Sequence, residues 1–205
     1  MNRNALLLST ALIGLIFLLG GAMPEPRNPP TANTGAPGET SCMLSNCHVG
    51  GSFTGTVSLS GLPDTVLADQ SYEITLFNRS NSVRSGFQMT VLDATNKFTG
   101  AFTGNAEVNV ARDNGNSRTY ARHALAKFLF NGEASWKFNW KAPASVLNDS
   151  MVFYFSSMCG NGDGNRTGDN SIKSSKRVIF KLPSASDDLL AETRTISAYY
   201  SKGAI

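Results

Sequence analysis

The residues most capable of chemistry lie in one short segment, Cys42-Met43-Leu44-Ser45-Asn46-Cys47-His48. Covalent haem attachment needs two thiols that add to the porphyrin vinyl groups and a histidine beside the second thiol, whose imidazole then lies beneath the iron. The usual motif has two residues between the cysteines, whereas four separate Cys42 from Cys47 here. The segment predicts a haem bound through Cys42 and Cys47, with His48 as the proximal iron ligand.

Three other interpretations of the cysteine segment stay open. In an oxidising compartment Cys42 and Cys47 could form a disulfide, although so short a loop gains little from cross-linking. A zinc ion could instead bind Cys42, Cys47, His48 and Cys159 in a tetrahedral site. The adjacency of Cys47 and His48 could also be coincidental. Cys159 is the third cysteine of the chain and is compatible with each of these interpretations.

A haem iron held by His48 has a sixth position on its distal side. His123 is the only other histidine of the chain and is the first choice for that position. Met89, on the apolar side of an alternating segment, is the second choice and would raise the reduction potential relative to histidine. Methionine at such a position more often fills the core. Met43 and Met158 are weaker candidates.

A glycine- and asparagine-rich loop offers oxygen atoms of the kind that calcium binds. It contains Asn161-Gly162-Asp163-Gly164-Asn165 and is followed by Asp169. No glutamate closes the loop in the EF-hand pattern. A turn stabilised by Asx side chains is therefore favoured over a calcium site at Asp163 and Asp169.

Alternation of apolar and polar residues predicts strands through most of the chain. Trp136, Phe138 and Trp140 alternate with polar residues. The same period of two occurs in residues 56–60, 72–76 and 87–91. Turn-forming residues separate such segments at intervals of about 8–12 residues, which is typical of sandwiches. The prediction is an all-β fold, an immunoglobulin-like antiparallel β-sandwich of about 8–9 strands with the cysteine segment at one end.

Composition divides the 205-residue chain into four regions. In residues 1–22, Arg3 precedes an apolar run of about 15 residues, which is shorter than the roughly 20 residues that a membrane-spanning helix needs. This segment predicts a cleaved signal peptide. Residues 23–40 are rich in Pro, Asn and Gly and predict a linker. Residues 41–183 form the predicted domain with the cysteine segment, and residues 184–205 form a C-terminal tail.

Composition also excludes several classes of function. The net charge of +3 comes without a cluster of Lys and Arg, which argues against nucleic acid as a partner. No second apolar run is long enough to span a membrane, so no stable span is expected after signal cleavage. The sequence has no Gly-x-Ser-x-Gly element, no phosphate loop and two histidines in all, so an enzyme is not predicted. The expected location is the periplasm or the cell exterior.

The sequence resembles a bacterial family of exported reelin-like (Reeler) β-sandwich domains with interchangeable C-terminal anchors. The resemblance begins at Gly35-Ala36-Pro37-Gly38-Glu39 and covers roughly residues 35 to 175. It is carried further by Gly50-Gly51, Ser60-Gly61-Leu62-Pro63, Gly86-Phe87-Gln88, Tyr120 with His123, Trp136-Lys137-Phe138-Asn139-Trp140-Lys141-Ala142-Pro143, Asn161-Gly162-Asp163-Gly164 and Gly168-Asp169. The family's Cys-x-x-Cys-His element is longer by two residues here, and no anchoring module is evident after Leu182, so surface display is not expected. The resemblance implies a Reeler-type sandwich with a c-type haem element, and it places His123 at the family's histidine position.

Together these features predict an exported, monohaem, c-type cytochrome-like protein that transfers electrons or senses redox state with an unknown partner protein. The alternative is a non-catalytic surface or matrix module, stabilised by a Cys42–Cys47 disulfide, that binds glycans or proteins.

Overall fold

Two β-sheets packed face to face form the part of the chain that the computed structural model describes, residues 27–43 and 48–183. The predicted signal peptide (residues 1–22), Cys47 and the predicted tail (residues 184–205) lie outside these ranges. The larger sheet has the order β1 (Val49–Gly50), β12 (Thr167–Lys181), β11 (Ser150–Gly160), β5 (Arg84–Asp93), β8 (Thr119–His123) and β7 (Val108–Arg112). Two short strands join its path, β3 (Thr65–Leu67) beside β12 and β9 (Lys127–Phe128) beside β5.

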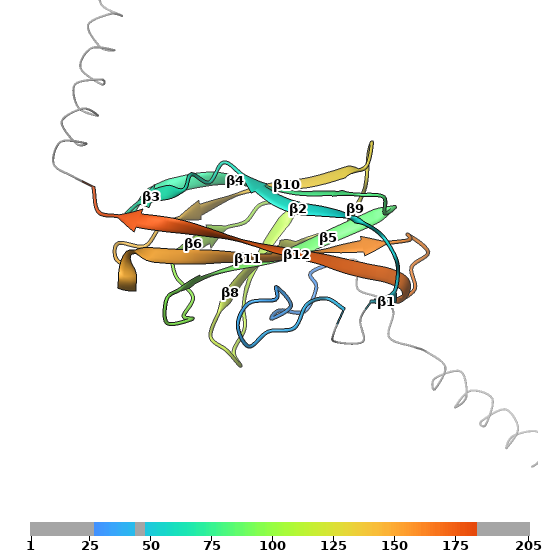
Figure 1. The fold of residues 1–205 in the computed structure, drawn as a ribbon, viewed down its shortest axis with the longest axis horizontal. Coiled ribbons are helices and arrows are strands. Elements are labelled where there is room, and N and C mark those ends of the chain that lie inside the picture. Colours follow the sequence, from blue (N-terminus) through green and yellow to red (C-terminus); the bar gives the residue numbers. More distant parts are fainter. Residues whose placement is uncertain (1–26, 44–47, 184–205) are drawn as a thin grey trace, which may run out of the picture.

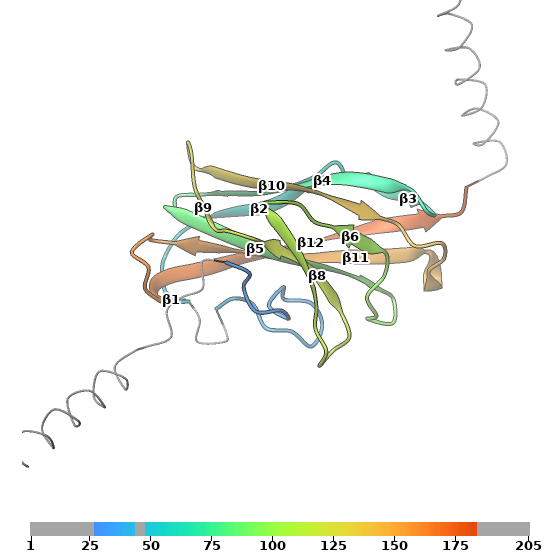
Figure 2. The ribbon, with the colours of Figure 1, turned by 180° about the vertical axis from the view of Figure 1, so that it is seen from behind.

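The smaller sheet has the order β2 (Gly55–Ser60), β4 (Ser71–Ser80), β10 (Glu133–Lys141) and β6 (Ala101–Thr103). A short 3₁₀ turn, η1 (Leu147–Asp149), precedes β11. Figures 1 and 2 show the two layers from opposite sides, with β4 and β10 in one layer and β5, β11 and β12 in the other. The predicted all-β sandwich is therefore confirmed.

The strands differ from the prediction in number and in direction. The described ranges hold twelve strands, because β1, β3, β6 and β9, each of two or three residues, pair at sheet margins where no alternating pattern marks them. The pairs β1–β12 and β3–β12 are parallel, while the other ladders are antiparallel.

The core forms between the inward faces of the two sheets. In β10 the period of two places Trp136, Phe138 and Trp140 inward, and all three are buried. The ring centroid of Phe87 on β5 lies 5.0 Å from that of Trp136, and Phe153 on β11 lies 4.9 Å from Trp140. Aromatic rings bury roughly 150–250 Å² each, so this layer contributes much of the free energy of folding.

The outer face of the larger sheet is covered by residues 27–43, which we call the N-terminal strap. In Figure 1 the strap is blue and lies on the side of β5 and β8 away from the smaller sheet. Gln88, an outward side chain of β5, bonds to the strap, and Thr90, the next outward side chain, is buried as well, so that this strand is buried on both faces. The predicted linker (residues 23–40) is thus packed on the sheet from Arg27 onward.

Candidate functional site

His48 is held by a buried carboxylate at the end of the larger sheet. It directly precedes β1, and its Nδ1 lies 2.7 Å from Oδ2 of Asp169 on β12. The side chain of His48 is 20% exposed and that of Asp169 is 5% exposed. The other oxygen of Asp169, Oδ1, accepts a hydrogen bond of 2.9 Å from the Asn161 amide. An ionised carboxylate only accepts, so Nδ1 of His48 donates, and in the neutral ring Nε2 keeps its lone pair.

The parallel pairing of β1 with β12 brings these two residues together. The amide of Val49 donates to the carbonyl of Arg166 at 2.9 Å, and the amide of Gly51 donates to the carbonyl of Asp169 at 2.8 Å. Gly51 has to be a glycine, because a Cβ there would lie 2.5 Å from the backbone carbon of Asp169. The backbone that follows His48 is therefore fixed, which limits the positions that its side chain can occupy.

Cys42 lies at the end of the strap, on the outer face of the larger sheet. Its Sγ is 3.6 Å from Oγ of Ser156 on β11, and it donates to the carbonyl of Asn33 at 3.8 Å. The cysteine is half-buried. Cys47 lies outside the described residues, so the structure gives the position of one of the two predicted thioether residues.

Buried polar contacts hold the strap in place. Glu39 accepts hydrogen bonds of 2.6 Å from Arg118, from the phenol of Tyr120 and from the hydroxyl of Thr34. The carboxyl of Glu39 is 1% exposed and the guanidinium of Arg118 is 11% exposed. Burial and the neighbouring Glu39 carboxylate raise the pKa of Tyr120, so its phenol stays protonated and donates. This group of residues ties the segment that carries Cys42 to β8.

Side chains of the sheet also satisfy backbone groups of the strap. Gln88 donates to the carbonyl of Pro30 at 2.5 Å and accepts from the amide of Asn33 at 2.7 Å. Oγ of Ser156 donates to the carbonyl of Asn33 at 2.6 Å. Gln88 and Ser156 are paired on neighbouring strands, and both side chains point outward. Their hydrogen bonds to the strap backbone therefore fix the position of the strap on the sheet.

His123, the predicted distal ligand, is buried at the point where β8 and β9 separate along β5. Its Nδ1 lies 2.9 Å from the amide nitrogen of Phe87, which donates to it, and 3.1 Å from the carbonyl oxygen of the same residue. Burial lowers the pKa of His123 to about 4, a backbone hydrogen bond with Phe87 opposes this, and the charges of Arg122, Arg84 and His48 lower the pKa further. The two histidines of the chain are therefore close enough to interact electrostatically.

The lowered pKa of His123 predicts that stability falls in mild acid. Below pH 6.5 His123 becomes protonated in the unfolded chain, whereas in the folded protein it stays neutral until about pH 4. The free energy of unfolding should therefore decrease as the pH falls from about 6.5 to about 4, by up to about 3 kcal/mol for this one group. Urea unfolding at a series of pH values measures the effect. His123→Gln should flatten the profile over this interval, and an equally steep profile in the variant would assign the loss to other groups.

Met89 and Cys159 face the core instead of the strap. Met89 is fully buried and belongs to the hydrophobic cluster between the sheets. Cys159 is fully buried, and its sulfur accepts from Nδ2 of Asn78 on β4 at 3.5 Å. The larger sheet therefore lies between these two sulfurs and Cys42, which contacts Ser156 on the outer face. This separation removes Cys159 from the zinc set and from pairing with Cys42, and it places Met89 on the wrong side of the sheet for a site at Cys42 and His48.

Met158 is the methionine of β11 that lies on the outer side, next to Asp169. A Cβ built on Gly160 would lie 2.9 Å from Sδ of Met158 and 3.3 Å from Oδ1 of Asp169, so both atoms border the same point. Met43 is 40% exposed on the strap. Of the two weaker methionine candidates, Met158 thus borders the carboxylate that holds His48.

The glycine- and asparagine-rich loop forms Asx-type turns, the interpretation that the sequence favoured over a calcium site. Asp163 accepts from the amide of Asn165 at 2.7 Å, and Asn161 accepts from the amide of Asp163 at 3.0 Å. Asp169 directs its oxygens to His48 and to the backbone of Asn161. Within the ranges that the structure describes, no three His, Cys, Asp or Glu side chains gather in a set that could hold a metal ion.

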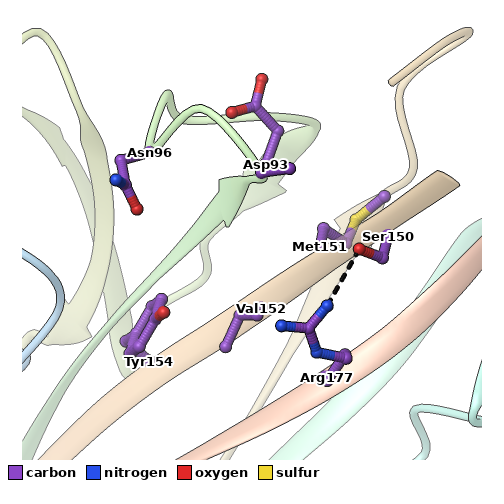
Figure 3. A pocket seen from close by; sticks show the side chains of 8 residues that line it. Asp93, Asn96, Ser150, Met151, Val152, Tyr154 and Arg177 are labelled. Carbon is purple, nitrogen blue, oxygen red and sulfur yellow. Dashed lines mark hydrogen bonds between the residues drawn. The ribbon is translucent and has the colours of Figure 1, made fainter. Parts of the chain in front are cut away.

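A shallow hollow elsewhere on the larger sheet has polar walls. It lies at the far end of β5 and β11, and Figure 3 shows Asp93, Asn96, Tyr154 and Arg177 around it. Arg177 donates to the hydroxyl of Ser150 at 3.1 Å, and Asp93 accepts from the turn that follows it. These contacts are structural, and the lining does not pair a nucleophile with a base.

The sequence did not predict the roles of two residues of the site, Asp169 as the partner of His48 and Glu39 as the partner of Arg118. Asp169 was named only as a possible calcium ligand in a loop expected to be a turn, and Glu39 only as part of the opening of the family resemblance. Their partners, His48 and Arg118, are 121 and 79 positions away in the chain. A charged residue within a stretch of glycine, proline and asparagine was the one available signal, and it does not identify the partner.

The structure defines a two-sheet β-sandwich domain with a cysteine–histidine segment at one end. It is similar to the reeler domain of human F-spondin, with 14% identity and a TM-score of 0.42 over 67% of this chain and 97% of that one. It is also similar to the Reelin-N domain of F-spondin, with 16% identity and a TM-score of 0.43 over 68% and 96%. BslA, a bacterial hydrophobin, has 15% identity and a TM-score of 0.33 over 66% and 98%. No protein-family model and no curated protein matches the sequence.

Residues 27–43 and 48–183 include no helix with the length and apolar character needed to span a lipid bilayer.

Proposed function

We propose that this protein is exported, carries one haem c on Cys42 and Cys47, and transfers electrons or senses redox state outside the cytoplasm. The observation that carries the proposal is the state of His48. Its Nδ1 is committed to the Asp169 carboxylate at 2.7 Å, and in the neutral ring Nε2 retains its lone pair. Histidines that bind metals regularly donate their other ring N–H to a carboxylate or carbonyl in this way.

The surrounding residues fit a covalently attached haem. Cys42 is half-buried at the end of the strap, and His48 lies at the edge of the sheet with part of its ring exposed. A thiol in such a position is accessible to an attachment enzyme, while the anchored strap holds it to the sheet. When bound, haem supplies a one-electron couple at the iron. Cys42 and Cys47 would hold it, His48 would ligate its iron, and Asp169 would fix the imidazole.

For the sixth position we propose Met158, on the outer side of β11 beside Asp169. His123, the first choice from the sequence, packs against Phe87 and Trp136 on the inner side of the larger sheet, the side that also holds Met89. Its Nδ1 accepts from the Phe87 amide, so in the neutral ring Nε2 carries the proton and has no lone pair for iron.

Expression with a cytochrome c maturation system tests the proposal. The purified protein should show a Soret band that survives denaturation, and its band on a denaturing gel should stain for haem peroxidase activity. Cys47→Ala should lose the two-bond attachment that pyridine haemochrome spectra report, because one thioether is missing.

Cys159→Ala is the matched control, because it removes a cysteine from the core and leaves the segment intact; it should retain the haem. Met158→Ala should turn a low-spin spectrum into a high-spin one if the thioether of Met158 fills the sixth position. A colourless protein that is two hydrogens lighter than its reduced mass would overturn the proposal. It would instead favour the disulfide-stabilised binding module.

A further inference from the structure

Asp169 is a carboxylate with very little access to water, although it is flanked by the exposed loop of residues 161–166. The residue is 3% exposed. One oxygen accepts from the Asn161 amide and the other from Nδ1 of His48. Both oxygens are therefore held in place, and a carboxylate that cannot rotate also fixes the imidazole that donates to it.

The charge of this carboxylate has a direct consequence for a metal on the far side of the ring. Hydrogen bonding from Nδ1 to an anion increases the electron donation of the imidazole. A buried negative charge also interacts more strongly than one in water, because the local dielectric constant is lower. Both effects favour ferric over ferrous iron and lower the reduction potential.

We infer that Asp169 is a positioning residue for the haem site, which fixes the ring of His48 with Nε2 toward the iron and lowers the reduction potential. This inference rests on the proposed haem. Each reduction takes up one electron from the redox partner protein, each oxidation returns one, and no bond of Asp169 is formed or broken.

Asp169→Asn in the haem-loaded protein tests the charge. The amide has nearly the shape of the carboxylate, and its oxygen accepts from Asn161 or His48, but it carries no charge. We expect the ferric-to-ferrous equilibrium to shift toward ferrous iron by about tenfold, which for one electron is about 59 mV toward positive potential. Spectroelectrochemical titration of the Soret band measures this shift.

Asp163→Asn is the matched control, since it removes one negative charge from the loop that flanks Asp169. Asp163 is exposed to solvent and contacts neighbouring loop residues. Water and salt screen such a charge, so its removal should leave the potential nearly unchanged. Equal shifts in the two variants, or no shift in Asp169→Asn, would overturn the inference while the haem itself stays established.

Nitrogen-15 NMR of the haem-free protein supplies a readout that needs no haem, and its main result comes from the unsubstituted chain. At pH 9, where an ordinary imidazole is neutral, His48 should carry its proton on Nδ1. Asp169→Asn should give a mixture of tautomers. A proton on Nε2 in the unsubstituted protein would refute the positioning role. Absence of haem after maturation would instead refute the proposed function.

Discussion

Arg118→Ala is expected to lower the free energy of unfolding by about 3–5 kcal/mol, the range found when one partner of a buried ion pair is removed. The carboxyl of Glu39 is 1% exposed and depends on Arg118 Nη1 at 2.6 Å for charge compensation. The same guanidinium donates to the carbonyls of Pro37 and Asn96, which would lose those bonds. Urea unfolding, followed by the fluorescence of the buried Trp136 and Trp140, gives the magnitude.

Lys137→Ala is the matched control because it breaks an exposed ion pair. Lys137 and Glu73 are 3.1 Å apart, with side chains 62% and 60% exposed. Such pairs contribute at most about 1 kcal/mol. Equal small losses in the two variants would contradict the importance of burial at Glu39.

A second substitution separates charge from packing. In Arg118→Ala, the change Glu39→Gln removes the uncompensated charge and keeps the side-chain volume. The double variant should recover at least about 1 kcal/mol over Arg118→Ala alone, because contacting residues couple by about 0.5–3 kcal/mol. Native-state hydrogen exchange at the amides of Gly35 and Glu39, which bond within the strap, reports whether the strap detaches before the sandwich unfolds.

The inner layers of the sandwich were predictable because each depends on a local pattern. Trp136, Phe138 and Trp140 alternate along β10, and a period of two with one apolar face specifies a strand wherever it occurs. The same pattern gives the inward face of β5. It does not reveal that Gln88 is buried as well, since this depends on the distant strap to which Gln88 bonds.

The strap was predicted as a linker because its composition is that of a linker. Proline and glycine restrict the backbone of the strap, which forms no strand of the two sheets. Its position is stabilised by hydrogen bonds from the side chains of Gln88, Ser156 and Arg122 to carbonyl groups of the strap. These partners belong to strands that lie next to one another only after folding. Polar composition therefore did not distinguish a solvated linker from one whose backbone groups are satisfied by a sheet.

The candidate site divides in the same way. The adjacency of Cys47 and His48 is local and was visible in the sequence. The contact between His48 and Asp169 depends on the register of the parallel pair β1–β12, which joins residues more than a hundred positions apart. The burial of His123 beside Gly86 depends on where β8 and β9 separate along β5.

Gly86→Ala should destabilise the protein by about 3 kcal/mol, at the upper end of the usual cost of overpacking a core. A Cβ at this position would lie 2.3 Å from Cε1 and 2.6 Å from Nδ1 of His123. The ring is not free to move away, because Nδ1 is bound to the Phe87 backbone and the ring packs near Trp136, with centroids 6.5 Å apart. Thermal and urea unfolding of the haem-free protein measure the loss.

Removing the ring should reverse part of this loss. Gly86→Ala combined with His123→Ala should be more stable than the sum of the two single effects predicts, because the added methyl then occupies space that the imidazole has left. Gly115→Ala is the matched control, since its Cβ would meet only Oδ1 of Asp113 at 3.2 Å in an exposed turn. Its effect should stay within about 1 kcal/mol. Strict additivity of the two substitutions at Gly86 and His123 would show that the imidazole does not occupy the space above Gly86, and it would remove the packing reason for glycine at that position.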